Sequence, residues 1–252
     1  MKRQKSIKLN KYISILGYGE VGRSIERLYL GYKITPKIKD KLIPSPSFDK
    51  KSILNVCIPF TENFLKTVCE EIERSKPILV IIHSTLPIGT TKQISNHFLN
   101  TPIVHSPVRG NHPNLTKSLK TFVKYIGSEN KKHSKLAKDH FKSIGIKSKI
   151  LKSSINTEVL KLSCTTFYGL CIAWYDYLND ICNTNDISFK DVVHWQDTYN
   201  EGYSKLNQQH FVRPMLSPPK NKKIGGHCII PNAKILNNLL PHVLVEHVIK
   251  FE

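Results

Sequence analysis

The stretch that decides the fold is Ile15-Leu16-Gly17-Tyr18-Gly19-Glu20-Val21-Gly22, where an apolar run passes into a helical pattern. Its glycines have the spacing G-x-G-x-x-G, directly after a predicted strand and at the start of a predicted helix. In such a loop Gly17 permits a tight turn, Gly19 lets a pyrophosphate approach the backbone, and Gly22 allows the helix to pack closely on the strand. The stretch therefore predicts a loop that binds a dinucleotide.

The residues around this loop supply further candidate contacts. Glu20 and Val21 open the helix, whose free N–H groups and positive dipole end would face the phosphates. Asp40 lies near the position, about 20 residues further along the chain, where an acidic side chain binds the adenosine ribose 2′-hydroxyl of NAD. Three lysines flank this aspartate, namely Lys37, Lys39 and Lys41. Because lysines could instead bind a 2′-phosphate, we expect NAD as the cofactor and leave NADP open.

From residue 12 to about 150, short apolar runs alternate with helical stretches, which predicts an α/β fold with a Rossmann-like, doubly wound parallel sheet. We expect strands at residues 12–16, 32–40, 52–59, 78–83, 102–105, 121–126 and 147–151. We expect helices at residues 20–30, 62–75, 91–99 and 133–143. These elements define a predicted dinucleotide-binding domain over residues 1–152.

The remainder, residues 153–252, is predicted to be a helical domain. Apolar residues recur at helical spacing over residues 156–182, which predicts one long central helix. A second helix is expected from Phe189, after a Ser188 cap, then a proline-containing loop over residues 207–223. A last helical stretch, residues 234–246, is interrupted by Pro241.

Aromatic residues on the long helix predict self-association. They are Phe167, Trp174, Tyr175 and Tyr177. A small helical domain cannot bury this much aromatic surface alone, so we expect a homodimer formed through this helix.

Composition narrows the function classes. The net charge of +19 attracts anionic, phosphate-bearing small molecules. The lysines are spread along the chain and no dense basic run contains interleaved aromatic residues, so we expect no nucleic-acid partner. No run reaches the roughly 20 apolar residues of a membrane helix, and the basic N-terminus precedes a strand instead of a signal-peptide core. We therefore expect a cytoplasmic protein with no membrane partner.

Cysteine spacing points to one candidate nucleophile. The six cysteines contain no Cys-x-x-Cys pair, which argues against a zinc site or a disulfide framework. Five of them lie in predicted strands or helices and are expected to be small core residues: Cys57, Cys69, Cys164, Cys171 and Cys182. Cys228 differs because Gly225 and Gly226 precede it, and glycines let a substrate approach the sulfur.

Five more motifs follow the glycine loop along the chain. They are Ile58-Pro59-Phe60-Thr61, His83-Ser84-Thr85-Leu86-Pro87-Ile88-Gly89-Thr90-Thr91, Ser106-Pro107, Glu158-x-x-Lys161 and Gly225-Gly226-His227-Cys228. In this order the motifs resemble those of the UDP-glucose/GDP-mannose dehydrogenase family, over about residues 12 to 240. The histidine–threonine segment and the cysteine segment are the specific ones.

This resemblance implies a dehydrogenase that oxidises a primary alcohol of a nucleotide sugar to an aldehyde, then through a cysteine thioester to a carboxylate. Cys228 would be the nucleophile. Lys161 would stabilise the developing alkoxide and oxyanion. Thr85 would hold an ordered water, and Pro59, Ser84 and Thr85 would belong to the cofactor site.

The chain also departs from the family pattern. Val108 stands where the family has glutamate, Thr165 where it has asparagine, and Asn232 where it has aspartate. These three groups manage the hydrolytic water in the family, so hydrolysis of a thioester is in question here. We also expect the chain to lack the family's third domain, which helps to hold the substrate's nucleotide.

Two alternatives stay open. The first is a two-electron hydroxyacid-type dehydrogenase, which would use a helix-borne lysine and leave Cys228 idle. The second is a cofactor-binding regulator or a catalytically inactive homologue, which would bind the dinucleotide without turning over a sugar nucleotide.

Overall fold

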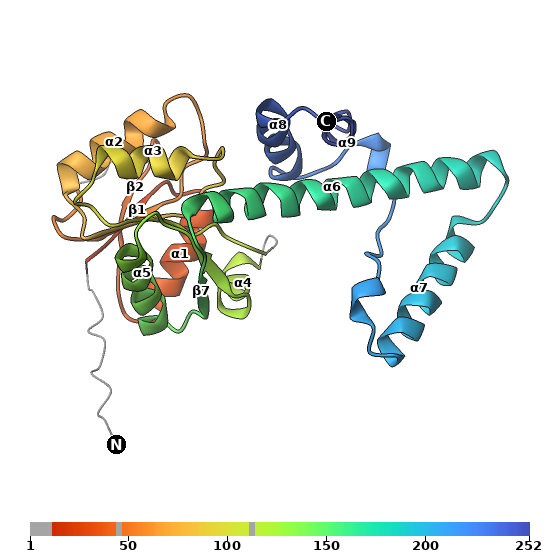
Figure 1. Cartoon of the computed structure of the whole chain (residues 1–252), viewed down its shortest axis with the longest axis horizontal. Coiled ribbons are helices and arrows are strands. Elements are labelled where there is room, and N and C mark those ends of the chain that lie inside the picture. The colour runs from red at the N-terminus through yellow and green to blue at the C-terminus, as the bar shows by residue number, and fades with distance from the viewer. Residues whose placement is uncertain (1–11, 44–46, 111–113) are drawn as a thin grey trace, which may run out of the picture. The chain divides into compact units, whose positions relative to one another are not determined.

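The computed structural model describes residues 12–43, 47–110 and 114–252. The chain divides into two compact units, Met1–Lys161 and Leu162–Glu252 (Figure 1). These units are defined by compactness. The predicted boundary between two domains at residue 152 stays a prediction. None of the helices in the described ranges is long and apolar enough to cross a membrane.

The first unit is built on a five-stranded parallel sheet. Its strands are β1 (Ile13–Leu16), β2 (Lys37–Lys39), β3 (Ile53–Val56), β4 (Leu79–Ile82) and β5 (Ile103–His105). They lie in the order β2-β1-β3-β4-β5, so the winding direction reverses between β1 and β3. In open parallel sheets ligands bind at such a switch point, outside the carboxyl ends of the strands.

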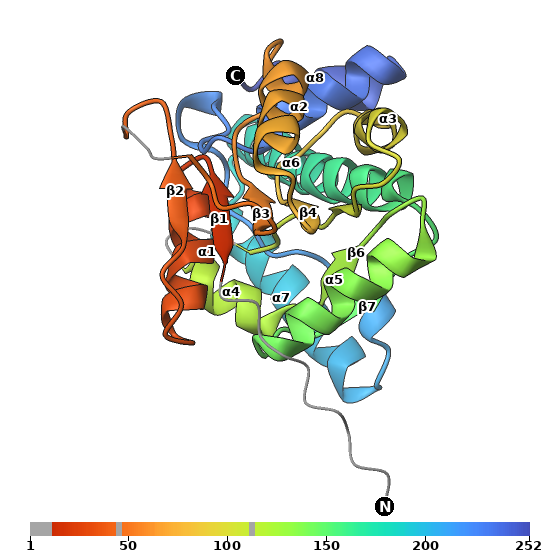
Figure 2. The ribbon, with the colours of Figure 1, turned by 90° about the vertical axis from the view of Figure 1, so that its left-hand side faces the viewer.

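Helices cover both faces of this sheet (Figure 2). On one face pack α1 (Glu20–Leu30), α4 (Leu115–Thr121) and α5 (Lys131–Ser143), and on the other α2 (Phe64–Ser75) and α3 (Thr90–His97). Successive strand residues point to opposite faces, so Ile53 joins the first core and Leu54 the second. Every residue of β1, β3, β4 and β5 is therefore buried, and most of these residues are apolar, as expected for a sheet covered on both sides. The predicted doubly wound sheet is confirmed.

Two more strands extend the first unit. β6 (Lys124–Ile126) and β7 (Ser148–Ile150) form a separate parallel pair. His105 at the end of β5 and Gly127 after β6 exchange both backbone hydrogen bonds, at 2.8 and 2.9 Å. This exchange fixes the pair beside β5.

The second unit is helical. The long helix α6 (Ser154–Thr184) begins in the first unit and continues into the second, where α7 (Phe189–Lys205), α8 (Ile229–Leu239) and α9 (Val243–Ile249) follow it. At Gly169 of α6, an added Cβ would lie 2.6 Å from a methyl carbon of Ile229 and 2.7 Å from one of Val248. Glycine at this position therefore allows α8 and α9 to approach α6 closely.

Most predicted elements are present, and three details differ. Helix α4 was not predicted, because only Leu115 and Leu119 mark its buried face before the strand-forming residues that follow. Helix α8 begins at Ile229, earlier than predicted, because Pro231 lies in its first turn, where proline costs little. Cys164 is exposed on α6, so the prediction that it is a core residue was wrong.

Candidate active site

The glycine loop joins β1 to α1 and has the geometry of a phosphate cradle. Gly17 has a φ of 96°, and a Cβ there would lie 2.7 Å from the backbone nitrogen of Ile58, so only glycine fits. A Cβ on Gly22 would overlap the carbonyl oxygen of Gly17. At Gly19, the N-cap of α1, a Cβ would meet no protein atom within 4 Å. The loop is thus tight on its protein side and open where a ligand would lie.

Asp40 follows β2 and holds this loop. Its Oδ2 accepts the backbone N–H of Tyr18 at 2.7 Å, and its Oδ1 accepts that of Leu42 at 3.2 Å. Glu20, the exposed first residue of α1, and the half-buried Val21 follow the loop. The carboxylate therefore lies beside the glycine loop, which is compatible with the predicted ribose contact.

Two of the lysines that flank Asp40 are engaged elsewhere. Lys37 forms an ion pair with Asp49 at 2.7 Å. Lys39 forms one with the buried Glu71, also at 2.7 Å. Only Lys41, which is exposed, remains of the three as a candidate ligand for a 2′-phosphate.

The loops after β3 and β4 complete the same edge of the sheet. Ser84 donates its hydroxyl hydrogen to the carbonyl oxygen of Ile58 at 2.6 Å, which ties the ends of the two strands together. Pro59 is exposed and Thr85 is half-buried. The predicted cofactor residues of the first unit therefore gather at the carboxyl edge of the parallel sheet, because every strand of that sheet ends there.

Glu158, predicted only as part of a motif with Lys161, caps a helix. It is fully buried in the first turns of α6. Its two carboxylate oxygens accept the backbone N–H groups of Gly89 at 2.7 Å and Thr91 at 2.9 Å, at the N-terminus of α3. A carboxylate is favourable there because these N–H groups have no partner within the helix and carry the positive end of its dipole.

Lys161 lies on α6, three residues after Glu158. Its Nζ donates to the carbonyl oxygen of Val108 at 3.2 Å, in the loop after β5. Val108 is itself buried and cannot supply the carboxylate that the related family has at this position. Lys161, the predicted electrophilic residue, is thus bound to the loop that contains Val108, one of the three positions where the chain departs from the family pattern.

Several buried polar side chains of this region were missed by sequence reasoning. His83 accepts or donates a hydrogen bond between its Nε2 and the Oδ1 of Asn55 at 3.0 Å, and burial lowers its pKa well below the usual value. His105 bonds through Nε2 to the carbonyl oxygen of Ser84 at 2.9 Å, and burial lowers its pKa to about 3, so the imidazole is neutral. Lys124 is buried in β6. The sequence signal for Lys124 was a single charged residue inside a run of strand-forming residues.

Cys228 belongs to the second unit, where it is the exposed N-cap residue of α8. Gly226 before it has a φ of 88°, a conformation that favours glycine. One turn later, the backbone N–H of the buried Asn232 donates to the carbonyl oxygen of Cys228 at 3.1 Å. The side-chain Nδ2 of Asn232 has no hydrogen-bond partner among the described residues.

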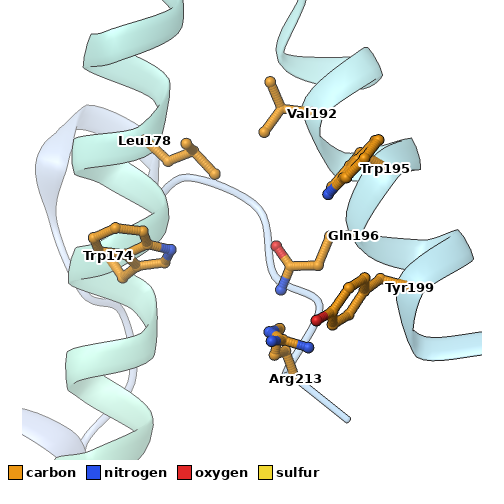
Figure 3. A pocket seen from close by; sticks show the side chains of 7 residues that line it. All are labelled: Trp174, Leu178, Val192, Trp195, Gln196, Tyr199 and Arg213. Carbon is orange, nitrogen blue, oxygen red and sulfur yellow. The ribbon is translucent and has the colours of Figure 1, made fainter. Parts of the chain in front are cut away.

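The second unit also contains an aromatic groove between α6 and α7, with a volume of about 370 Å³ (Figure 3). It is lined by Trp174, Leu178, Val192, Trp195, Gln196, Tyr199 and Arg213. The guanidinium of Arg213 lies 4.2 Å from the ring centre of Tyr199. The side chain of Asn200 holds the backbone of Arg213 through two hydrogen bonds, each 2.9 Å.

The predicted aromatic surface of α6 is confirmed at three positions and wrong at one. Phe167, Trp174 and Tyr177 are each more than half exposed. Tyr175 is buried: its hydroxyl donates to the carbonyl oxygen of Pro214 at 2.9 Å, and its ring centre lies 6.4 Å from that of Phe189.

The sheet order, the glycine loop and the helical second unit define the fold of the Rossmann-like dehydrogenases. No known family profile matches the chain. The chain is 27% identical over 191 residues to the UDP-N-acetyl-D-mannosamine dehydrogenase of Methanococcus maripaludis strain S2, covering 74% of this chain and 41% of that protein. The enzyme of the same name from strain C7 is 30% identical over 154 residues, covering 60% and 33%. The resemblance to nucleotide-sugar dehydrogenases is thereby confirmed, and the chain spans well under half the length of these curated relatives.

Solved structures agree on the fold. The UDP-D-ManNAc dehydrogenase of Pyrococcus horikoshii superposes with a TM-score of 0.75 at 17% identity, over 95% of this chain and 67% of that one. The 3-hydroxyisobutyrate dehydrogenase of Mycobacterium tuberculosis superposes with a TM-score of 0.72 at 12% identity, over 94% and 91%. Among the residues that the structure describes, no group of three or more histidine, cysteine, aspartate or glutamate residues could hold a metal ion.

The capping role of Glu158 yields a stability prediction. Glu158→Ala leaves the buried N–H of Thr91 and the half-buried N–H of Gly89 without an acceptor, so the free energy of unfolding should fall by about 3–5 kcal/mol. Glu158→Gln keeps one acceptor oxygen and should cost about 1–2 kcal/mol. Denaturant unfolding monitored by circular dichroism measures both, with the exposed Glu73→Gln of α2 as the control, expected within about 0.5 kcal/mol of wild type. Equal stabilities for Glu158→Ala and the control would contradict the capping role.

Proposed function

We propose that this chain is a nicotinamide-dependent oxidoreductase that oxidises an alcohol group of a nucleotide sugar. The observation that carries the proposal is the glycine loop, which at Gly17 packs closely against the loop after β3 and at Gly19 is open. The UDP-N-acetyl-D-mannosamine dehydrogenases among the relatives support the substrate class. The net charge of +19 suits a substrate that carries a diphosphate.

The residues of the first unit fit a bound dinucleotide. The backbone at Gly19 and the N–H groups at the start of α1 would hold the pyrophosphate, and Asp40 would accept a hydrogen bond from the ribose hydroxyl. Pro59, Ser84 and Thr85 would line the nicotinamide side. A bound nicotinamide would supply hydride acceptance, and Lys161 would stabilise the alkoxide from which the hydride leaves.

NAD is the favoured form of the cofactor over NADP. The ion pairs of Lys37 with Asp49 and of Lys39 with Glu71 withdraw two cations from a 2′-phosphate. The carboxylate of Asp40, held by the N–H of Tyr18, would repel such a phosphate.

A side chain at Gly19 should remove cofactor binding without unfolding the protein. Gly19→Val places methyl groups in the space that the pyrophosphate would fill, while meeting no protein atom within 4 Å at Cβ. We expect NAD affinity, measured by calorimetric titration, to fall at least about 100-fold, because the backbone can no longer approach the phosphates. The control is Gly202→Ala on α7, where a Cβ also meets nothing. Unchanged affinity in Gly19→Val would sink the site assignment.

The second half of the proposed reaction depends on Cys228. Its thiolate would add to the aldehyde carbon to form a thiohemiacetal, which would lose a second hydride to become a thioester. Water would then displace the sulfur, giving the carboxylate and restoring the thiol. Across the whole reaction two hydrides pass from the substrate to two successive NAD molecules, one water is consumed and three protons are released. Because Val108, Thr165 and Asn232 replace the groups that manage this water in related enzymes, the last step is expected to be slow.

Mass spectrometry of the intact protein tests this route. In wild type incubated with NAD and UDP-N-acetylmannosamine, slow hydrolysis should let a covalent adduct accumulate on Cys228. Cys228→Ser should form neither adduct nor carboxylate and should keep NAD affinity, because serine is a poor nucleophile without an adjacent base. Cys164→Ser, which removes the exposed thiol of α6, serves as the control and should behave as wild type. Full carboxylate production by Cys228→Ser would exclude the thioester route.

A two-electron hydroxyacid-type oxidation is the second candidate function. The 3-hydroxyisobutyrate dehydrogenase fold matches nearly the whole of both chains, which favours it. It would need Lys161 but neither Cys228 nor a hydrolytic water, which suits Val108 and Asn232. If Cys228→Ser oxidises 3-hydroxyacids as fast as wild type does, the two-electron oxidation is favoured over the thioester route. NAD binding without turnover of any sugar nucleotide or hydroxyacid would favour the regulator or inactive homologue.

We further propose a homodimer in which a second copy covers the aromatic groove and the exposed face of α6. Both tryptophans of the chain, Trp174 and Trp195, line this groove and are more than half exposed. Exposed tryptophans at one place on a soluble protein mark an association surface. The chain has no other tryptophan, so the tryptophan fluorescence reports on this groove alone.

Dilution measurements test the dimer. Light scattering at micromolar concentration should give twice the chain mass, and tryptophan emission should shift to longer wavelength on dilution as water reaches the groove. Trp174→Glu should be monomeric, because a charge in the buried interface is unpaired. Leu99→Glu, at an exposed position of the first unit, should stay dimeric. A monomeric wild type would rule the dimer out.

A further inference from the structure

Three consecutive carbonyl groups in the loop after β5 accept hydrogen bonds from two lysine side chains. The Nζ of Lys124 donates to the carbonyl oxygen of Ser106 at 2.5 Å and to that of Pro107 at 3.2 Å. The Nζ of Lys161 donates to the next carbonyl oxygen, that of Val108, at 3.2 Å. The loop of residues 106–108 is thus held by one lysine from β6 and one from α6.

The charged side chain of Lys124 is costly to bury at its position in β6. Its side chain is 4% exposed in a strand whose neighbours are apolar. Among residues 12–43, 47–110 and 114–252, no carboxylate forms an ion pair with it. The two carbonyl groups and the ring of Phe141, whose centre is 5.6 Å from Nζ, are what stabilise the ammonium. Burying an ammonium without a carboxylate partner is costly, and the hydrogen bonds to the two carbonyl oxygens offset part of that cost.

Lys124 and Lys161 donate hydrogen bonds to the same loop, residues 106–108. Ser106 is tied to the sheet by its own N–H, which donates to Ile82 at 2.8 Å, and by its hydroxyl, which donates to the carbonyl oxygen of Tyr125 at 2.7 Å. Pro107 has no N–H to donate, and the Nζ of Lys124 holds its carbonyl oxygen. The position of the Val108 carbonyl follows from it.

We infer that Lys124 is a positioning residue, which fixes residues 106–108 and thereby the place of the Lys161 ammonium at the reacting alcohol. The inference rests on the proposed function for the role of Lys161. It adds a residue that touches neither substrate nor cofactor and acts only through the loop.

The charged and titratable groups around Lys124 set its response to pH. Burial, the largest cause, lowers the pKa of Lys124 to about 7, and the charge of Lys161 lowers it further, while the Cys57 thiol raises it. His83 and His105 also lie within electrostatic range and are neutral because burial lowers the pKa of each. Below pH 7 the Lys124 ammonium donates charge-assisted hydrogen bonds to the carbonyl oxygens of Ser106 and Pro107. Above pH 7 it is a neutral amine, whose bonds are weaker.

Turnover measurements test the inference on the full chain. At pH 6.5, Lys124→Met should lower kcat between about 10- and 100-fold, because a displaced Lys161 no longer faces the alkoxide, with NAD affinity within about twofold of wild type. In wild type, kcat should fall as pH rises through about 7. Lys124→Arg, whose guanidinium stays charged, should recover activity at pH 6.5 and lose that fall. Lys149→Met, at an exposed position of β7, is the control. An unchanged kcat in Lys124→Met would overturn the inference.

Hydrogen exchange tests the same inference without turnover, so a protein inactive on every alcohol would sink the proposed function alone. The peptide covering residues 103–110 should lose protection between pH 6 and pH 8 in wild type, after correction for the intrinsic exchange rate. Lys124→Arg should keep its protection over this range. Lys124→Met should lack it at both pH values, and if that variant does not fold, the contrast between wild type and Lys124→Arg decides. Equal protection in wild type and Lys124→Arg at both pH values would contradict the positioning role.

Discussion

The buried carboxylate of Glu158 is the interaction on which the arrangement of the first unit depends. It binds the N–H groups at the start of α3 and thereby joins the first turns of α6 to the loop after β4. Lys161 lies one turn further along the same helix, so the cap also sets where its ammonium can reach. Glu158, which the sequence shows as part of the motif with Lys161, has a structural role here: its hydrogen bonds to α3 place the start of α6, and with it Lys161, near the edge of the sheet.

The same edge is held by charged side chains that each bind backbone groups. Asp40 binds the N–H of Tyr18, Glu158 binds those of α3, and Lys124 binds the carbonyls after β5. Loops that line a ligand site cannot take part in a sheet, and their backbone groups still need partners. Charged side chains supply those partners with strong, directional bonds. These bonds fix the backbone of the loops, and the space beside Gly19 stays open.

The sequence predicted those helices and strands that depend on residues close to one another along the chain. The glycine spacing and the helical period predicted helix α1 at residues 20–30 and a long helix within one turn of the observed α6. Residues whose role depends on a distant contact were out of reach: the cap by Glu158 needs α3, and Lys124 needs the loop after β5. Tyr175 and Trp174 are adjacent on one helix and point in different directions, and the contacts that bury the tyrosine, with Pro214 and Phe189, come from distant segments. The order of motifs predicted the relationship to nucleotide-sugar dehydrogenases, and the roles of Cys228 and Lys161 stay predictions.

The central claim is that a dinucleotide binds at the carboxyl edge of the parallel sheet. Nuclear magnetic resonance of the ¹⁵N-labelled chain during titration with NAD tests it most directly. The account predicts that the amide signals of Gly17, Gly19 and Val21 shift most, followed by those of the loops after β2, β3 and β4. Signals from α7 and the aromatic groove should stay in place. Saturable shifts confined to the groove, or no shift at Gly19 at millimolar NAD, would contradict it.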